Sequence, residues 1–227
     1  DFNNILTSIL TNIYLAKMAI DSNGDAYHRL LESETASERA RNLTQQLLTF
    51  SRGGAPVKKT LSLGRIIKDS SVFALGGSNV GCEFSLSDDL LPVEADEGQM
   101  EQIVRNLIIN AAQAMPDGGV VAVSAEDVLL GPEDGIPVAA GKYIKLPVRD
   151  HGVGLKPGEE RLVFNRFWRA DPSRARPPGG TGLGLSIVKH VAASHGGEVR
   201  VWSVEGQGST FTLTLPRKPG PLPGSSS

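Results

Sequence analysis

Two apolar stripes with helical spacing open the chain. The first lies within residues 2 to 20 and the second within residues 26 to 52, and both advance in steps of four and three, the heptad spacing of packed helices. Asp21-Ser22-Asn23-Gly24 between them is a turn sequence, so the pattern predicts an antiparallel helical hairpin. The stripe positions are Phe2, Leu6, Ile9, Ile13, Ala16 and Ile20, followed by Ala36, Ala40, Leu43, Leu47 and Phe50.

Two helices cannot cover both of their apolar faces. A second copy of the hairpin would cover them in a four-helix bundle, so we expect a homodimer through residues 1 to 54. Gly53-Gly54-Ala55-Pro56 interrupts the pattern and predicts a domain boundary.

The remainder of the chain mixes strand-like and helix-like stretches without regular alternation. This predicts an α+β domain with a mixed sheet over residues 55 to 217. Residues 218 to 227 are mostly Pro, Gly and Ser, which is typical of a disordered tail. The expected helices span residues 63–73, 98–115 and 185–194, and the expected strands span residues 82–86, 93–95, 120–125, 143–149, 199–204 and 210–215.

Composition narrows the class of protein. The formal net charge of -2 gives no electrostatic footprint for nucleic acid, and one cysteine, Cys82, excludes an internal disulfide and favours a reducing compartment.

No apolar run approaches the roughly 20 residues of a membrane span. The chain opens on Asp1 inside a helical pattern, so we interpret it as part of a longer cytoplasmic protein. Any membrane or sensor segment would lie upstream, with no direct membrane contact in this fragment.

Three short motifs carry candidate chemistry. Asn106 and Asn110 lie four apart on one predicted helix, so their amides share a face, and amide oxygens suit Mg²⁺. Asp150-His151-Gly152-Val153-Gly154 follows a strand, where a fixed carboxylate could accept the amino group of a purine and glycines would allow close approach. Each motif taken singly is also compatible with a solvated helix face or an ordinary turn.

The third motif is a glycine-rich loop before a helix. Gly179-Gly180-Thr181-Gly182-Leu183-Gly184-Leu185 would present backbone N–H groups and a helix N-terminus, which attract phosphate. A flexible hinge is the alternative for this loop. The spacing is neither the Rossmann fingerprint nor a P-loop.

Taken in order, the three motifs resemble the N, G1 and G2 boxes of histidine kinases. Phe164-Asn165-Arg166-Phe167-Trp168-Arg169, between the last two, resembles the F box, and Asp1-Phe2-Asn3-Asn4 resembles the segment just after the phosphoacceptor histidine. The resemblance covers residues 1 to 217 and implies an α/β sandwich ATP-binding domain of the superfamily shared with gyrase, Hsp90 and MutL. Residues 1 to 125 resemble nitrogen-regulator kinases and residues 164 to 216 resemble actinobacterial sensor kinases, as natural divergence or an engineered chimera would give.

The resemblance assigns the nucleotide site. Asn110 would hold Mg²⁺ on the ATP phosphates, and Asn106 would stand where related ATPases often have a catalytic glutamate, with an amide that cannot act as a base. Asp150 would bind the adenine amino group in a pocket shaped by Gly152 and Gly154. Residues 155 to 184 would form a mobile lid. Its implied ATP-contacting residues are Phe164, Arg166, Arg169, Gly180, Thr181, Gly182, Leu183 and Gly184.

The resemblance also assigns the phosphotransfer segment. The acceptor histidine would directly precede Asp1, which would act as its base, and phosphate would pass to an aspartate of a response-regulator receiver domain. Asn4 would orient the water that dephosphorylates the regulator. The family often has a cation where this chain has Gln113, so one phosphate contact is missing or comes from a lid arginine.

The four histidines of the chain follow no acceptor pattern, and we interpret them as structural or surface residues. They are His28, His151, His190 and His195. Two other functions remain open from the sequence: an ATPase of the gyrase or Hsp90 kind, and a non-catalytic scaffold that changes shape when it binds nucleotide.

Overall fold

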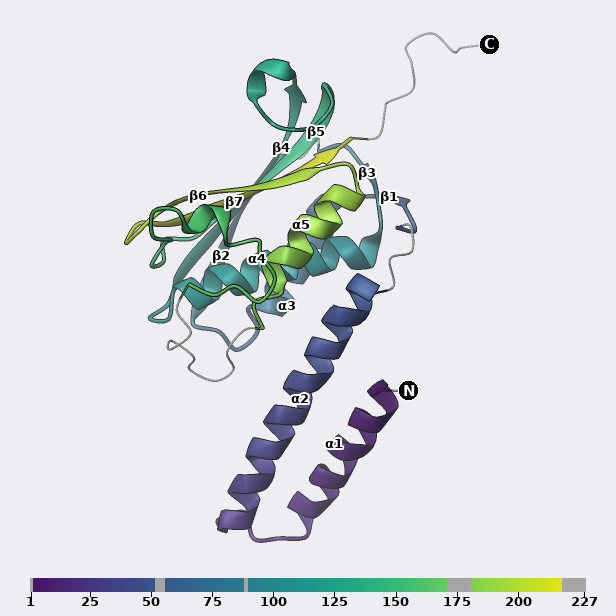
Figure 1. The fold of residues 1–227 in the computed structure, drawn as a ribbon, viewed down its shortest axis with the longest axis vertical. Coiled ribbons are helices and arrows are strands. Elements are labelled where there is room, and N and C mark those ends of the chain that lie inside the picture. Colours follow the sequence, from purple (N-terminus) through teal and green to yellow (C-terminus); the bar gives the residue numbers. More distant parts are fainter. Residues whose placement is uncertain (1, 52–55, 88–89, 171–180, 218–227) are drawn as a thin grey trace. The chain divides into compact units, whose positions relative to one another are not determined.

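The computed structural model describes residues 2–51, 56–87, 90–170 and 181–217 (Figure 1). The described chain forms two compact units. One unit holds the first two helices, and the other holds the sheet and the remaining helices; we refer to the second as the sheet unit. Within the described residues, no helix combines the length and apolarity needed to cross a membrane.

The first unit is the predicted helical hairpin. Helix α1 (Phe2–Met18) and helix α2 (Asp25–Ser51) run antiparallel and are joined by a short turn (Figure 1). Leu6 and Ile13 of the first stripe are buried against α2, whereas Ile9 of the same stripe is 42% exposed. The side chains of Leu43, Leu47 and Phe50 lie outside the described part, so the second stripe stays a prediction there.

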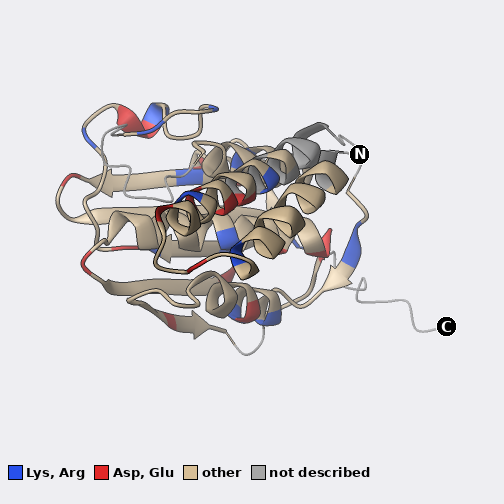
Figure 2. Cartoon of the chain, turned by 90° about the horizontal axis from the view of Figure 1, so that it is seen from below, with Lys and Arg blue, Asp and Glu red and all other residues tan. Residues whose placement is uncertain are grey.

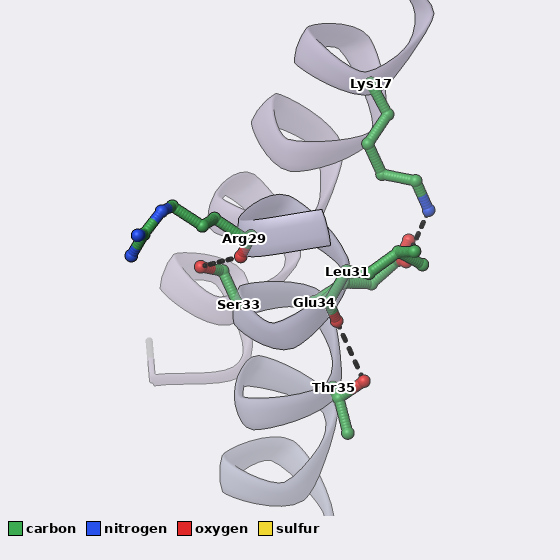
Figure 3. A network of polar contacts seen from close by, with 6 residues as sticks. All are labelled: Lys17, Arg29, Leu31, Ser33, Glu34 and Thr35. Carbon is green, nitrogen blue, oxygen red and sulfur yellow. Dashed lines mark hydrogen bonds and ion pairs between the residues drawn. The ribbon is translucent and has the colours of Figure 1, made fainter. Parts of the chain in front are cut away.

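One polar contact joins the two helices near the turn. The Lys17 ammonium lies 2.6 Å from the Glu34 carboxylate (Figure 3). The same ammonium lies 5.5 Å from the centre of the Tyr27 ring. The hydrogen bond to Glu34 raises the pKa of Lys17. Tyr27 and Glu34 are two turns apart on α2, so Lys17 of α1 contacts α2 at two levels.

The sheet unit is a mixed sheet with helices packed on it. The sheet order is β2-β4-β5-β7-β6; β2 and β4 are parallel and the other neighbours antiparallel, as the irregular alternation predicted. Inward side chains such as Val123, Leu146 and Phe211 alternate with outward ones and are buried. The strands are β2 (Val80–Leu86), β4 (Gly119–Leu130), β5 (Gly141–Arg149), β6 (Glu198–Val204) and β7 (Gly208–Pro216).

The helices of this unit are α3 (Leu63–Ala74), α4 (Glu97–Ala114) and α5 (Gly184–Ser194), each within two residues of its prediction. Two short strands, β1 (Lys59–Leu61) and β3 (Val93–Ala95), form a separate antiparallel pair, and β1 was not predicted. Strand β4 continues five residues beyond its predicted end because residues 126–130 pair with β5. Figure 2 shows Lys and Arg interspersed with Asp and Glu along the ribbon.

Candidate functional site

The centre of the site is the carboxylate of Asp150, immediately after β5. Asp150 is 1% exposed. Its Oδ1 accepts hydrogen bonds from the peptide N–H of Gly152 at 2.9 Å and of Ser209 at 3.2 Å. Its Oδ2 is buried and has no hydrogen-bond partner within the described structure. Burial raises the pKa of this carboxyl, and the two backbone N–H groups oppose that shift.

An unpartnered, buried carboxylate oxygen is costly for a protein to keep. Two peptide N–H groups already donate to Oδ1 and hold the carboxylate in one orientation. Oδ2, the oxygen that can still accept a hydrogen bond, therefore points in a fixed direction. A ligand that brings an N–H group to Oδ2 would satisfy it. The residues present therefore fit the exocyclic amino group of adenine.

The glycines after Asp150 are required by the protein's own packing. A Cβ on Gly152 would lie 2.3 Å from the carbonyl oxygen of Ala114, and a Cβ on Gly154 would lie 2.1 Å from that of Val204. Gly154 also has a φ of +65°. The sequence pattern predicts close approach of a ligand at these glycines; the structure shows that backbone from α4 and β6 fills the space instead.

The turn between β6 and β7 closes the site from the other side. A Cβ on Gly208 would lie 2.2 Å from the carbonyl oxygen of Asp150. Asp150 and Ser209 exchange hydrogen bonds, because the Asp150 N–H also donates to the Ser209 carbonyl at 2.9 Å. Ser209 was not singled out from the sequence. Gly206 and Gly208 predict a tight hairpin, but their spacing gives no sign that the turn contacts Asp150.

Helix α4 carries both predicted asparagines. The side chain of Asp96 caps the helix by accepting from the Gln99 N–H at 3.1 Å. Asn106 and Asn110 are both half-buried on this helix. The Asn106 amide nitrogen donates to the carbonyl of Gly184 at 3.2 Å, so the structure brings the first and third motifs into contact.

Helix α5 begins at this contact. Gly184 is its first residue, and the Ser186 hydroxyl donates to the Leu183 carbonyl at 2.8 Å. Leu183 is 1% exposed and anchors the start of the helix in the core. A helix N-terminus carries partial positive charge, so the Asn106 side chain lies beside a place where an anion is favoured.

The predicted lid is only partly separate from the domain. Leu155 and Val163 are buried, and the Phe164 ring packs edge-on against Phe211 with centres 6.2 Å apart. These side chains pack into the core, and the mobility of a lid over residues 155 to 184 stays a prediction. The Phe167 N–H donates to the Gly182 carbonyl at 2.9 Å, which connects Phe167 to the glycine-rich loop.

The remaining predicted residues lie at the margin of this arrangement or outside it. Arg166 and Arg169 are exposed, and Thr181 is half-buried. Gly180 and Asp1 lie outside the described residues. Asn4 is exposed on α1, in the other unit.

The histidines form no metal site; among the described residues no group of three or more His, Cys, Asp or Glu could hold a metal ion. His28, His151 and His190 are exposed. His195 is 2% exposed and has a structural role, as predicted. Its Nε2 accepts from the Asp96 N–H at 3.1 Å, so its Nδ1 carries the proton and donates to the Val191 carbonyl at 2.9 Å. Burial lowers its pKa.

Helix α4 connects the two ends of the site. Asn106 contacts the start of α5, and the carbonyl of Ala114 accepts from the Val153 N–H at 3.1 Å beside the Asp150 loop. These contacts are two helical turns apart, about 12 Å at 1.5 Å per residue. Asn110 lies between them on the same helix. The arrangement suits an elongated ligand with an amino-bearing base at one end and anionic groups at the other.

Comparisons with known proteins agree with this geometry. Residues 95–219 match the model of the family described as histidine kinase-, DNA gyrase B- and HSP90-like ATPase. The chain is 43% identical over 129 residues to the sensor-like histidine kinase SenX3 of Mycolicibacterium smegmatis, covering 57% of this chain and 30% of that protein. It is 41% identical over 188 residues to the sensor histidine kinase MtrB of Mycolicibacterium paratuberculosis, covering 79% of this chain and 31% of that protein. The chain thus spans about a third of these relatives.

Solved structures share the fold. The mycobacterial sensor histidine kinase MprB superimposes with a TM-score of 0.57 at 29% identity, over 72% of this chain and 100% of that one. Full-length ShkA in complex with AMPPNP superimposes with a TM-score of 0.73 at 23% identity, over 95% of this chain and 43% of that one, a similarity of fold.

Proposed function

This chain belongs to the histidine kinase-, DNA gyrase B- and HSP90-like ATPase family, and we propose that it is the ATP-dependent core of a sensor histidine kinase. In this proposal the sheet unit is the catalytic domain and binds ATP with Mg²⁺. The phosphoryl group then passes to a histidine of the helical hairpin and onward to an aspartate of a response regulator. The relatives named sensor histidine kinases support this choice within the family.

One observation carries the nucleotide assignment: the buried, unpartnered Oδ2 of Asp150. Adenine has an amino group at the position where guanine has a carbonyl oxygen. A carboxylate oxygen can accept from the amino group but repels the carbonyl. Because two peptide N–H groups hold Oδ1, Asp150 cannot turn to avoid that mismatch. The site therefore selects adenine.

The phosphate end is assigned to α4 and the start of α5. Asn110 would supply an oxygen ligand to Mg²⁺, which neutralises phosphate charge when bound. The N-terminal dipole of α5 would attract the phosphates, with Arg166 and Arg169 as further cations. Asn106 holds the Gly184 carbonyl and has no basic group to activate water, so the site favours transfer to protein over hydrolysis.

The hairpin would supply the acceptor. We propose that the residue before Asp1 in the parent protein is the phosphoacceptor histidine. Its ring nitrogen attacks the γ-phosphorus, the bond to the bridging oxygen of ADP breaks, and Asp1 holds the ring proton. Asn4, exposed on the same helix, would orient water during dephosphorylation of the regulator. Pairing of two hairpins in a four-helix bundle would complete the dimer.

Calorimetric titration with Mg-ATP tests the central assignment. The unmodified chain should bind ATP in preference to GTP. Asp150→Asn should weaken ATP binding by roughly 1.5–3 kcal/mol, because its amide keeps Oδ1 in place and turns an N–H group toward the adenine amino group. Absence of ATP binding, or equal affinity in the Asp150→Asn variant, would overturn the proposal.

A labelling experiment separates a kinase from an ATPase. The parent protein, incubated with γ-labelled ATP, should acquire an acid-labile phosphate on a single histidine. Steady release of inorganic phosphate without any labelled protein would instead identify an ATPase.

A further inference from the structure

The hydroxyl of Ser203, on β6, is the meeting point of three segments around the nucleotide site. The N–H of Leu155, just after the Asp150 loop, donates to Ser203 Oγ at 2.9 Å. Ser203 Oγ donates to the carbonyl of Gly208 in the β6–β7 turn at 3.0 Å. The hydroxyl of Ser209 lies 3.0 Å from the same oxygen.

The proton positions in this cluster follow from counting donors. Gly208 contributes only an acceptor, and Leu155 contributes only a donor. A serine hydroxyl has one proton and two lone pairs, and a carbonyl can only accept, so Ser203 donates its proton in the contact with Gly208. Ser209 is then the donor in the contact between the two hydroxyls. With that assignment every capacity of Ser203 Oγ is used.

Each segment that Ser203 joins also holds Asp150. The N–H of Ser209 donates to Asp150 Oδ1, and Gly208 packs on the carbonyl of Asp150. Leu155 ends the loop whose Gly152 N–H is the other donor to Oδ1. Ser203 itself is neither adjacent to Asp150 in sequence nor hydrogen-bonded to it.

We propose that Ser203 is a positioning residue that sets the direction of the free oxygen of Asp150 and thereby the preference for adenine. This inference rests on the proposed nucleotide site. Without the Ser203 hydroxyl, the Leu155 loop and the β6–β7 turn lose their common partner. The two donors to Oδ1 are then free to move relative to each other, and the carboxylate can rotate.

This role makes a distinctive prediction about base selectivity. ATP and ITP differ at the purine 6-position, where ATP has an amino group and ITP has a carbonyl oxygen. A carboxylate that can rotate makes a weaker hydrogen bond to the amino group of ATP, and it can turn away from the carbonyl oxygen of ITP. The affinities for the two nucleotides should therefore become more similar. General destabilisation of the domain would instead weaken both nucleotides by the same factor.

The experiment measures dissociation constants of ATP and ITP by calorimetry for the unmodified chain, Ser203→Ala and Ser203→Cys. We expect the ratio of the ITP dissociation constant to the ATP dissociation constant to fall by about tenfold in both variants. A hydrogen bond to a charged group accounts for at least that factor. The cysteine variant keeps the side-chain size with a weak donor, and it serves as the test if the alanine variant does not fold. Ser85→Ala, an exposed serine on β2, is the matched control and should keep the original ratio.

The outcomes are distinguishable. A ratio that stays unchanged in the Ser203 variants, while the unmodified chain prefers ATP, overturns the role of Ser203 and leaves the nucleotide site intact. An unmodified chain that binds ATP and ITP equally overturns the proposed adenine site itself.

Discussion

The imidazole of His195 accepts a hydrogen bond from the peptide N–H of Asp96, with 3.1 Å between the two nitrogens. The carboxylate of Asp96 accepts from Gln99 at the start of α4 and from Val57 near the beginning of the sheet unit. Asp96 thus joins the end of α5, the start of α4 and the segment before β1. The contact requires His195 to be neutral, because a protonated Nε2 cannot accept.

Acid should weaken this contact. The pKa of His195 is lowered from 6.5 by burial, and the neighbouring charges are Lys58, which lowers it further, and Asp96, which raises it. Below pH 6.5 the unfolded chain binds a proton that the folded chain does not, so the free energy of unfolding should fall by up to about 1.4 kcal/mol per pH unit. Urea unfolding at pH 7.5 and 5.5 measures this change in the free energy of unfolding. The change should be smaller in His195→Gln, which has no imidazole to protonate. An equal change in the two proteins would contradict a buried, neutral His195.

The buried carboxyl of Asp150 should have the opposite dependence. Its pKa is raised from 3.8, so its contribution to stability is complete below pH 3.8 and is lost as pH rises through the folded-state value. The free energy of unfolding of the unmodified protein should therefore decrease relative to that of Asp150→Asn between pH 4 and pH 7. Parallel denaturation curves of the two proteins test this without nucleotide. A constant difference across the range would mean that burial does not disfavour the ionised form.

Gly154→Ala should destabilise the sheet unit severely. The new Cβ would approach the Val204 carbonyl to 2.1 Å at a residue with a φ of +65°, so we expect a loss of at least about 3 kcal/mol. Gly158→Ala is the matched control, because Gly158 has a φ of +92° but a Cβ added there would have no atom within 4 Å. It should lose only about 1–2 kcal/mol from the backbone conformation. Equal losses in thermal unfolding would show that contact with Val204 is unimportant.

Asn106→Asp should weaken nucleotide binding by about tenfold. The variant replaces the donor to the Gly184 carbonyl with an oxygen that repels it, and it adds negative charge beside the start of α5. Calorimetry with Mg-ATP measures the effect. Glu101→Gln, an exposed change nearer the start of α4, should bind ATP normally. Unaltered affinity in Asn106→Asp would separate Asn106 from the phosphate end.

The proposed dimer can be tested on α1. Ile9 and Leu15 are 42% and 56% exposed, whereas Leu6 is 6% exposed. Ile9→Lys with Leu15→Lys should give monomers that keep their helical content, because both side chains are exposed on the single hairpin. Leu6→Lys should instead reduce helicity, since it buries a charge between the two helices. Light scattering and circular dichroism distinguish the results; a monomeric unmodified chain would exclude the dimer at the concentration tested.

Local patterns in the sequence predicted the helices and strands well because their signals are local. The spacing of Asn106 and Asn110 placed both on one helix, and the strand before Asp150 placed it at a strand end. Strand β1 escaped prediction although β3, which is equally short, was predicted. Val93-Glu94-Ala95 alternates apolar and polar residues, whereas residues 59–61 have only one apolar side chain and show no period of two.

The parts of the site that could not be predicted depend on distant pairs. Asp150 and Ser209 are 59 residues apart, and Asn106 and Gly184 are 78 apart. No local rule relates such positions. The same limit explains the glycines: the sequence shows that Gly152 and Gly154 are small, but only the fold shows that Ala114 and Val204 occupy the space beside them.

The strand order has a consequence for how the protein is made. Among the strands that the structure describes, β7 is synthesised last, yet it lies inside the sheet between β5 and β6. Until it leaves the ribosome, β5 has an unpaired edge and Asp150 lacks one of its two backbone donors. The helices and β4–β5 can form earlier, but the nucleotide site cannot be completed while residues 208–216 are still in the exit tunnel. Nascent chains stalled before this strand should therefore depend on chaperones and bind no ATP.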